Sequence, residues 1–208
     1  MIKNIIFDLG NVILGYDKER VARKFTSNID EIKFIKEKIF DSPEWELLDL
    51  GIITNDEAIQ IISKKEDPKY AKLIDVFFHE WYKVQSINKD TINIAKQLKE
   101  RGYNIFVLSN MAKETYEYFK DLDFFKLSTG IVISAYENIK KPDEKIFKIL
   151  LERYNLKPED CLFIDDDDTG KSYDISNRLG IKGRRVKPND SKDVLKLLKE
   201  NDIECSMN

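Results

Sequence analysis

The length, composition and charge of this chain exclude several classes of protein. It has 208 residues, of which 42% are hydrophobic, enough for one ample domain or for a core with a small insert. The 35 Lys and Arg residues nearly balance the 38 Asp and Glu residues, so we expect neither a nucleic acid nor a membrane as partner. The longest stretch without a charged residue, Gly102–Ala112, is too short to cross a bilayer, and the N-terminus does not resemble a signal peptide. We therefore expect a soluble, cytoplasmic globular protein.

The first predicted element is a strand over Ile2–Phe7, which ends at Asp8. The segment that follows, roughly residues 16–88, has apolar residues at helical spacing, such as Ile32, Ile35 and Ile39, and no convincing strand. Both ends of this segment lie near the end of the first strand, so we expect it to hang over that end as a lid. The predicted domains are a core of residues 1–15 and 89–208 and a helical cap of residues 16–88.

Later in the chain, short apolar runs alternate with helical patterns. The runs are typical of strands buried on both faces of a parallel sheet, and they lie at residues 105–108, 131–133 and 161–164. Helices are predicted over residues 91–101, 142–154, 169–179 and 193–199. Strands alternating with helices imply right-handed crossovers. We therefore predict the α/β class, with a Rossmann-like, doubly wound parallel sheet as the core and a small helical cap inserted after the first strand.

Polar residues follow the predicted strands at their carboxyl ends, where open α/β sheets bind ligands. The residues expected to meet at this edge are Asp8, Ser109, Asn110, Asp165, Asp166 and a lysine from Lys140-Lys141. Taken singly, each has an ordinary explanation as a turn residue, a helix cap or a solvated charge. Their occurrence together at one edge favours a ligand site.

The run Asp165-Asp166-Asp167-Asp168 is the most informative of these features. Four consecutive carboxylates repel one another, and the cost of that repulsion falls if a divalent cation lies among them. Asp167 and Asp168 are interpreted as a solvated acidic turn. Asp165 and Asp166, directly after a buried strand, are interpreted as part of a metal site.

The ordered segments that carry this chemistry resemble the motifs of the haloacid dehalogenase superfamily. The matching segments are Phe7-Asp8-Leu9-Gly10-Asn11-Val12, Leu108-Ser109-Asn110, Lys140-Lys141-Pro142 and Phe163-Ile164-Asp165-Asp166. The resemblance covers almost the whole chain, and the insert is placed like the helical C1-type cap of this superfamily. Within it, the Asp-Leu-Gly-Asn-Val segment and the loop Gly51-Ile52-Ile53-Thr54 are most similar to the α-D-glucose-1-phosphate phosphatase-like branch.

The resemblance implies a Mg²⁺-dependent phosphatase that hydrolyses a small phosphorylated metabolite through an aspartyl-phosphate. Asp8 would be the nucleophile, and Mg²⁺ would be held by Asp8, the Gly10 carbonyl and Asp166. Asp165 would support the metal site or hold Lys141, which would neutralise Asp8 and the phosphoryl oxygens. Ser109 and the Asn110 backbone N–H would bind those oxygens. We expect a sugar phosphate, such as a hexose 1-phosphate, as substrate and a monomer or weak homodimer as the working form.

Gly10 departs from the pattern that the resemblance implies. Phosphatases of the superfamily usually carry a second Asp at this position as general acid and base, and losing such a group costs about 10²–10⁴ in rate. Two explanations stay open. A sugar 1-phosphate leaves through a hemiacetal oxygen and needs less protonation, or Asp17 at the cap junction takes over the proton transfer. The ordinary interpretation of Asp17 is an N-cap of the next helix.

The cap is expected to select the substrate. Tyr16, Trp45, Asp49 and the loop at Gly51 are candidates to face the leaving group, because aromatic faces and a carboxylate suit a sugar. Trp45 fits equally well in a small core of the cap itself.

Two other functions compete with the phosphatase. One is a metal-independent 2-haloacid dehalogenase that uses the same aspartate, with which the absence of a second Asp is compatible. The other is a non-catalytic phosphate-binding or regulatory protein with a degenerate site. The acidic pair Asp165-Asp166 argues against the dehalogenase, because a carbon–halogen substrate gains nothing from a metal pocket.

Overall fold

The computed structural model describes residues 1–207 and contains a five-stranded parallel sheet. The strand order is β3-β2-β1-β4-β5, and the strands are β1 (Asn4–Phe7), β2 (Asn104–Ser109), β3 (Gly130–Ile133), β4 (Cys161–Asp165) and β5 (Lys182–Arg185). The first four match the predicted runs. The edge strand β5 was not predicted, because its sequence Lys-Gly-Arg-Arg carries no apolar run and its charged side chains are exposed.

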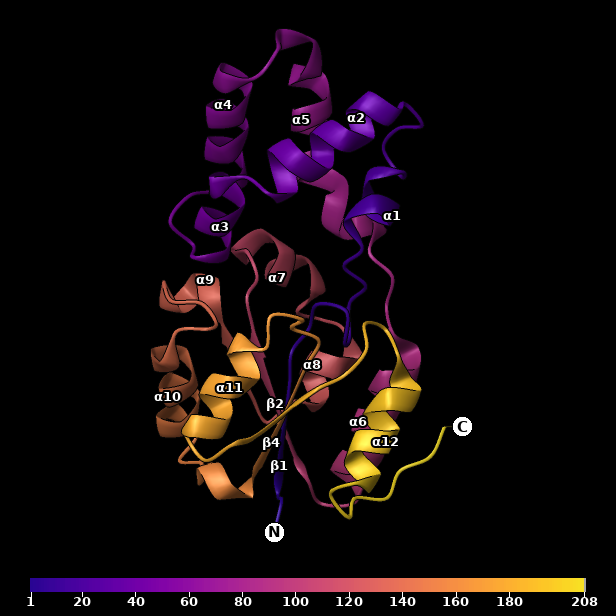
Figure 1. The fold of residues 1–208 in the computed structure, drawn as a ribbon, viewed down its shortest axis with the longest axis vertical. Helices are drawn as coiled ribbons and strands as arrows, with labels where there is room; N and C mark the ends of the chain where they lie inside the picture. Colours follow the sequence, from indigo (N-terminus) through magenta and orange to yellow (C-terminus); the bar gives the residue numbers. More distant parts are fainter. Residues whose placement is uncertain (208) are drawn as a thin grey trace.

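Helices cover both faces of the sheet, so the predicted α/β architecture is confirmed (Figure 1). Ile5 and Phe7 point to one face and pack with α6 (Lys89–Glu100) and α12 (Ser191–Lys199). Ile6, between them in β1, points to the other face, where α10 (Glu144–Arg153) packs. This period of two buries both faces of the central strand. The other helices of the sheet lobe are α7 (Lys113–Phe119), α8 (Asp123–Leu127), α9 (Ser134–Glu137), the 3₁₀ turn Pro158–Asp160 and α11 (Lys171–Arg178).

The strand register brings the carboxyl ends of the central strands to one level. Phe7 pairs with Val107 of β2 and with Ile164 of β4. The Asp8 N–H continues the ladder by donating to the Ile164 carbonyl at 2.9 Å. Asp8 and Asp165 therefore stand side by side at the same edge of the sheet.

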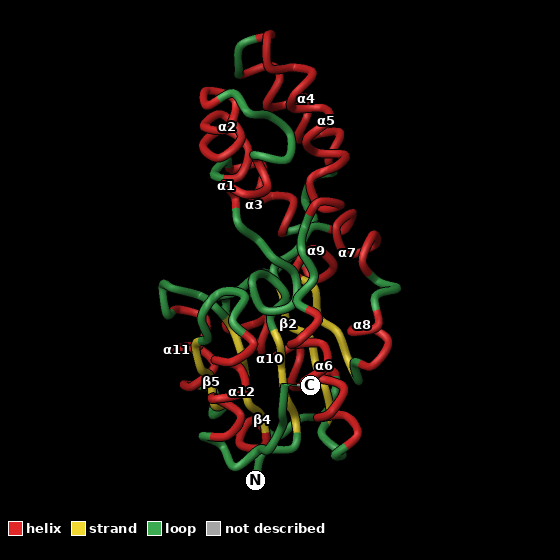
Figure 2. The backbone as a smooth tube through the Cα atoms, turned by 90° about the vertical axis from the view of Figure 1, so that its right-hand side faces the viewer, coloured by secondary structure: helices red, strands yellow, loops and turns green. Residues whose placement is uncertain are grey.

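A second lobe of helices stands above that edge (Figures 1 and 2). We call the helices between Lys18 and Val84 the cap lobe. They are α1 (Lys18–Ala22), α2 (Ile29–Phe34), a π-helix (Ile35–Phe40), α3 (Pro43–Asp49), α4 (Asn55–Lys65), a 3₁₀ turn (Pro68–Tyr70), α5 (Ala71–Glu80) and a 3₁₀ helix (Trp81–Val84). The lobe has its own apolar cluster around Ile35, Phe77 and Trp81. Within residues 1–207, no helix has the length and apolar character needed to cross a membrane.

Two kinds of contact fix the cap lobe on the sheet lobe. The entering and leaving segments pair with each other, since the Gly15 N–H donates to the Ser86 carbonyl at 2.8 Å. The second contact is made by the end of α3, residues Asp49-Leu50-Gly51, which we call the docking turn. The Ser134 hydroxyl of α9 donates to the Asp49 carbonyl at 2.5 Å.

Gly51 explains why the docking turn sits so close to α9. Its φ is +66°, and a Cβ placed there would lie 2.0 Å from the Ala135 carbonyl oxygen. Only glycine fits this backbone conformation and this approach without displacement. The Asn138 side-chain amide adds a hydrogen bond of 2.8 Å to the Leu50 carbonyl. The position of α3 relative to the sheet is therefore set by the close backbone approach at Gly51 and by side-chain hydrogen bonds to the carbonyls of the docking turn.

Candidate active site

A buried lysine bridges two aspartates at the carboxyl edge of the sheet. Lys141 Nζ lies 2.8 Å from Asp8 Oδ1 and 2.7 Å from Asp165 Oδ2. All three side chains are less than a tenth exposed. Buried charges are tolerated when they are paired and hydrogen-bonded, and this arrangement meets both conditions for Lys141.

Asp166 completes a cluster of three carboxyl groups. One oxygen each of Asp8, Asp165 and Asp166 lie within 4.8 Å of one another. Three carboxylates against one ammonium leave two negative charges uncompensated in a partly buried site. A divalent cation matches both the charge and the preference of hard cations for oxygen ligands.

The acidic loop after β4 is held by its own backbone. The Asp167 N–H donates to Asp165 Oδ1 at 2.9 Å. The Asp167 carboxylate in turn accepts the N–H groups of Thr169 and Ser172, each at 2.9 Å. With one Asp165 oxygen on Lys141 and the other on this loop, Asp165 is fully engaged. Asp167 therefore organises the loop, which its interpretation as a solvated turn residue did not anticipate.

Asn11, in the loop after β1, orients the carboxylate of Asp166. Its backbone has a φ of +52°, a conformation that Asn tolerates better than most residues. The Asn11 side-chain amide donates to Asp166 Oδ2 at 3.0 Å, while its Oδ1 accepts the Tyr16 N–H at 2.7 Å. No role was predicted for Asn11, and its only signal was a place within the Phe7–Val12 segment that carries the family resemblance.

Burial and neighbouring charges shift the pKa values of the bridged groups. Burial raises the pKa of Asp8 to about 7. The charge of Lys141 lowers this pKa and the charge of Asp165 raises it, but burial has the largest effect. Burial alone lowers the pKa of Lys141, but the charges of Asp165 and Asp8 outweigh it and raise that pKa. Burial also raises the pKa of Asp166. Lys141 is thus a permanent cation, whereas Asp8 needs additional positive charge to be fully ionised near neutral pH.

Asn110 positions Lys141 through a reciprocal pair of hydrogen bonds. The Lys141 N–H donates to Asn110 Oδ1 at 2.8 Å, and the Asn110 amide donates to the Lys141 carbonyl at 2.9 Å. This use of the Asn110 side chain was not predicted. Ser109 is buried beneath it, at the end of β2.

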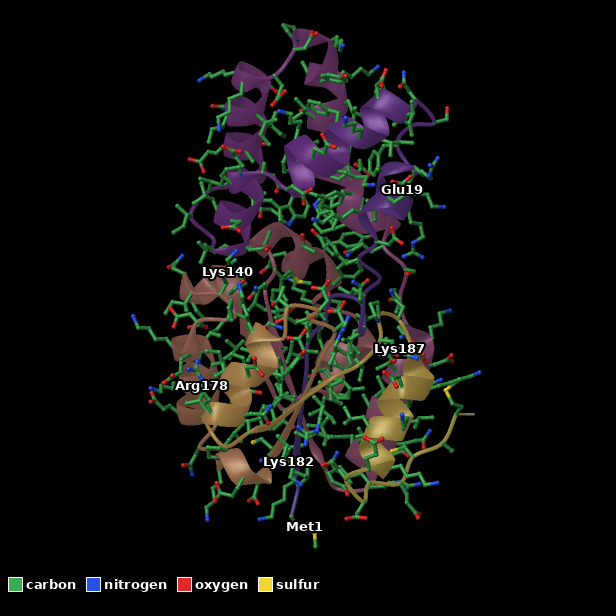
Figure 3. All side chains as sticks on the ribbon, in the orientation of Figure 1. Met1, Glu19, Lys140, Arg178, Lys182 and Lys187 are labelled. Atoms are coloured by element: carbon green, nitrogen blue, oxygen red, sulfur yellow. The ribbon has the colours of Figure 1, made fainter. Side chains whose placement is uncertain are left out.

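A cavity of about 1190 Å³ opens above the cluster, between the two lobes. The sheet lobe contributes Asp8, Gly10, Asn110, Lys141, Asp165 and Asp166 to its walls. The cap lobe and its entry segment contribute Tyr16, Phe40, Trp45, Asp49 and Trp81. Lys140, labelled at the junction of the lobes in Figure 3, lies 3.4 Å from Glu46 of α3.

The remaining predicted site residues do not line the cavity themselves. Ser109, Asp17 and Gly51 are not among the cavity-lining residues in the described part of the chain. Asp17 is the N-cap of α1, because its carboxylate accepts the Arg20 N–H at 2.9 Å. Trp45 was expected either to face the leaving group or to belong to the core of the cap. It lines the cavity, and it also packs on Trp81 with ring centroids 4.8 Å apart.

The parallel sheet, the acidic pocket at its carboxyl edge and the helical lobe above it define an α/β protein of the capped hydrolase class. The chain belongs to the haloacid dehalogenase-like hydrolase family, whose model matches residues 2–170. The membership predicted from the sequence motifs is therefore confirmed.

Curated relatives are distant and differ in length. The chain is 23% identical to drimenol cyclase drtB of Aspergillus calidoustus over 80% of its own length but only 31% of the cyclase. It is 22% identical to sesquiterpene phosphatase astK of Aspergillus oryzae, over 79% of the chain and 80% of that protein. A glyceraldehyde 3-phosphate phosphatase of Pyrococcus furiosus is 32% identical over 41% of the chain and 36% of that protein.

Solved structures share the fold. A haloacid dehalogenase family enzyme, bt-2542 of Bacteroides thetaiotaomicron, solved with magnesium and inorganic phosphate, superposes with a TM-score of 0.71 at 22% identity, covering 91% of this chain and 96% of that one. The L-2-haloacid dehalogenase of Xanthobacter autotrophicus superposes with a TM-score of 0.64 at 14% identity, covering 99% and 85%. The fold therefore occurs both in an enzyme solved with magnesium and phosphate and in a dehalogenase.

Proposed function

We propose that this protein is a Mg²⁺-dependent phosphatase that hydrolyses a small phosphorylated metabolite through an aspartyl-phosphate intermediate. The observation that carries this proposal is the position of Asp8. Its buried carboxyl group lies at the floor of a large cavity, held by Lys141 and beside Asp166. A nucleophile between an ammonium and a cation site suits an anionic phosphate ester better than a neutral carbon–halogen bond.

The acidic cluster has the chemistry of a Mg²⁺ site. Asp8 and Asp166 offer carboxylate oxygens, and Gly10 lines the same cavity with its backbone. Bound there, the ion supplies charge neutralisation for the phosphoryl oxygens. Asp165 acts as a supporting group, because both of its oxygens are already used by Lys141 and the acidic loop.

Two segments of the sheet lobe would bind the phosphoryl group. The Lys141 ammonium neutralises negative charge on Asp8 and on the transferring oxygens. The Asn110 backbone N–H would donate to those oxygens from the cavity wall. The Ser109 hydroxyl, buried directly before it at the end of β2, would donate from below that wall. Asn110 also fixes the Lys141 backbone, so the phosphate cradle and the lysine are held as one unit.

We assign the leaving group to the cap side of the cavity, in the predicted cap of residues 16–88. Tyr16, Trp45 and Trp81 present aromatic surface there, beside the carboxyl group of Asp49. Aromatic faces with few polar groups suit the alternating apolar and hydroxyl surfaces of a sugar. A sugar phosphate such as a hexose 1-phosphate is the proposed substrate class, and the phosphatase names of two curated relatives support phosphate ester hydrolysis.

The decisive experiment measures phosphate release from a panel of sugar phosphates and from p-nitrophenyl phosphate, with Mg²⁺ and with EDTA. We expect turnover with Mg²⁺ and its loss in EDTA. Halide release from a 2-haloacid in EDTA, without phosphate release, would instead establish the dehalogenase. Binding of phosphate without turnover of any substrate would establish a non-catalytic protein.

Mg²⁺ binding is expected to depend on pH, because a proton and the cation compete for Asp8. Burial raises the pKa of Asp8 to about 7, so the ionised form that binds the ion is lost as pH falls below that value. Mg²⁺ affinity should therefore fall about tenfold per pH unit below neutrality and level off above it. The measurement is the Mg²⁺ concentration that gives half-maximal thermal stabilisation at several pH values.

Two substitutions control this titration. Asp166→Asn should remove the Mg²⁺-dependent stabilisation, because it deletes a proposed ligand. Asp168→Asn, in the same loop but exposed, should keep it. An Mg²⁺ midpoint that is constant across the pH range would contradict the assignment of Asp8 as a ligand.

A further inference from the structure

The position two residues after Asp8 offers no group for proton transfer. Gly10 lines the cavity, and a Cβ built on it would make an ordinary contact of 3.5 Å with Asp8 Oδ2. Its φ is outside the left-handed region. Neither space nor backbone conformation therefore requires glycine at this position. What the glycine removes is a side chain that could transfer a proton. An alkoxide leaving group needs a proton from another element of the cavity wall.

Most carboxyl groups that line the cavity are already engaged or lie in the open. Asp41 is hydrogen-bonded to Lys18, and Glu46 faces Lys140 with a side chain that is 70% exposed. In the loop after β4, Asp165 and Asp166 belong to the acidic cluster, Asp167 holds the loop backbone, and Asp168 is exposed. None of these is a free carboxyl group enclosed on the leaving-group side.

Asp49 differs from all of them. Asp49 lies at the end of α3 and lines the same cavity as Asp8. Its carboxyl group makes no hydrogen bond and no ion pair with any of the residues 1–207 that the structure describes. Its backbone is fixed on the sheet lobe, because the Ser134 hydroxyl donates to the Asp49 carbonyl and accepts the Met111 N–H at 3.0 Å. The carboxyl group is therefore unpaired, and the backbone that carries it is held from the sheet side.

The surroundings of Asp49 favour a group that changes protonation near neutral pH. Burial raises the pKa of Asp49 to about 7; the charge of Lys140 opposes the shift, and those of Glu46 and Asp8 add to it. Tyr16 lines the same cavity. Burial raises the pKa of its hydroxyl well above the ordinary value and the charge of Asp49 adds to this shift, so Tyr16 stays neutral. A general acid that must later act as a base works best with a pKa near the operating pH.

We propose that Asp49 is the general acid and base of this enzyme, supplied by the cap in place of the side chain that Gly10 lacks. The inference rests on the proposed phosphatase function. In the first step Asp8 attacks phosphorus, the bond from phosphorus to the leaving oxygen breaks, and that oxygen takes the proton of Asp49. In the second step the Asp49 carboxylate takes a proton from water. The water oxygen attacks phosphorus, and the bond to Asp8 breaks with its electron pair returning to the carboxylate.

This assignment ties proton transfer to cap docking. Asp49 reaches the cavity because the docking turn lies on α9, through the Ser134 hydrogen bond and the close approach of Gly51 to Ala135. A cap lobe lifted from the sheet would carry the proton donor away with it. Enclosure of the substrate and completion of the catalytic set are then one event.

The test compares two substrates in the Asp49→Asn variant. Glucose 6-phosphate leaves as a poor alkoxide, whereas p-nitrophenyl phosphate leaves as a stable phenolate that needs no proton. With glucose 6-phosphate we expect kcat to fall by about 10²–10⁴. With p-nitrophenyl phosphate we expect a burst of about one equivalent of phenolate at nearly the wild-type rate, followed by slow turnover, because the aspartyl-phosphate forms but is not hydrolysed.

Matched variants separate this role from a structural one. Asp41→Asn, in the same cavity wall but paired with Lys18, should keep wild-type kinetics with both substrates. Gly10→Asp added to Asp49→Asn should restore glucose 6-phosphate hydrolysis at least about tenfold by placing a carboxyl group beside Asp8. Asp49→Asn activity within about threefold of wild type on glucose 6-phosphate, or equal losses of the burst and of that activity, would overturn the proposal. A wild-type protein that releases no phosphate from any sugar phosphate of the panel or from p-nitrophenyl phosphate would defeat the phosphatase function itself, and the role of Asp49 with it.

Discussion

Replacement of Asp8 by Asn is expected to lower kcat on any phosphate ester by a factor on the order of 10⁴ or more. The amide cannot attack phosphorus, so no aspartyl-phosphate forms. The fold should survive, because Asn has the same shape and Lys141 keeps its contact with Asp165 at 2.7 Å. The measurement is steady-state phosphate release together with trapping of the phosphorylated enzyme at low pH.

The stability of the Asp8→Asn variant gives a second, independent readout. Burial raises the pKa of Asp8 to about 7, above its value in the unfolded chain, so the folded protein binds the Asp8 proton more tightly than the unfolded one. Without Mg²⁺, the stability linked to this group is fully present at low pH and is lost as pH rises through about 7. Asn removes this titration, so the variant should lose less stability than wild type between about pH 5 and pH 8.

Asp17→Asn is the matched control for the kinetics. Asp17 lies close to Asp8 in sequence but caps α1 away from the cavity lining, and Asn is also a good N-cap. We expect its activity and stability to match wild type. Wild-type turnover in the Asp8→Asn variant would show that Asp8 is not the nucleophile, and loss of activity in Asp17→Asn would restore Asp17 as a candidate for proton transfer.

The fold was predictable where burial leaves a clear pattern in the sequence. The runs at β1, β2, β3 and β4 are continuous and apolar because both faces of those strands are covered by helices. The edge strand β5 has no such pattern, because its charged side chains face solvent and it is held by backbone pairing with β4. Its presence depends on the register of its neighbour, which the local sequence does not encode.

The site residues that lie at the carboxyl ends of strands could be predicted from the sequence. Asp8 and Asp165 follow buried runs, so the sheet topology alone brings them together. Asn11 and the docking turn are different, because their roles arise from contacts between segments far apart in the chain. Asn11 reaches Asp166 across 155 positions, and Ser134 reaches the Asp49 carbonyl across 85. Such contacts have no period or spacing that a single sequence displays.

Replacement of Lys141 by Met is expected to have the largest combined effect on activity and stability. Met has nearly the length of lysine but no charge, so Asp8 and Asp165 lose the cation that lies 2.8 Å and 2.7 Å from them. Breaking a buried ion pair in this way costs about 3–5 kcal/mol of unfolding free energy. Separately from this loss of stability, the variant should have a kcat that is lower by a factor of about 10²–10³, because the cation that stabilises charge at the reacting phosphorus is missing. Chemical denaturation and steady-state kinetics measure the two effects.

The stability and the activity of this variant should respond differently to a second substitution. Asp165→Asn added to Lys141→Met removes one of the two unpaired carboxylates, so a large part of the lost unfolding free energy should return. Activity should not return, because the cation beside Asp8 is still missing. Mg²⁺ should stabilise the single variant more than wild type, since it becomes the remaining positive charge near Asp8. If both substitutions together left the protein as unstable as Lys141→Met alone, the electrostatic account of the bridge would be wrong, and the lysine would act mainly through packing of its carbon chain.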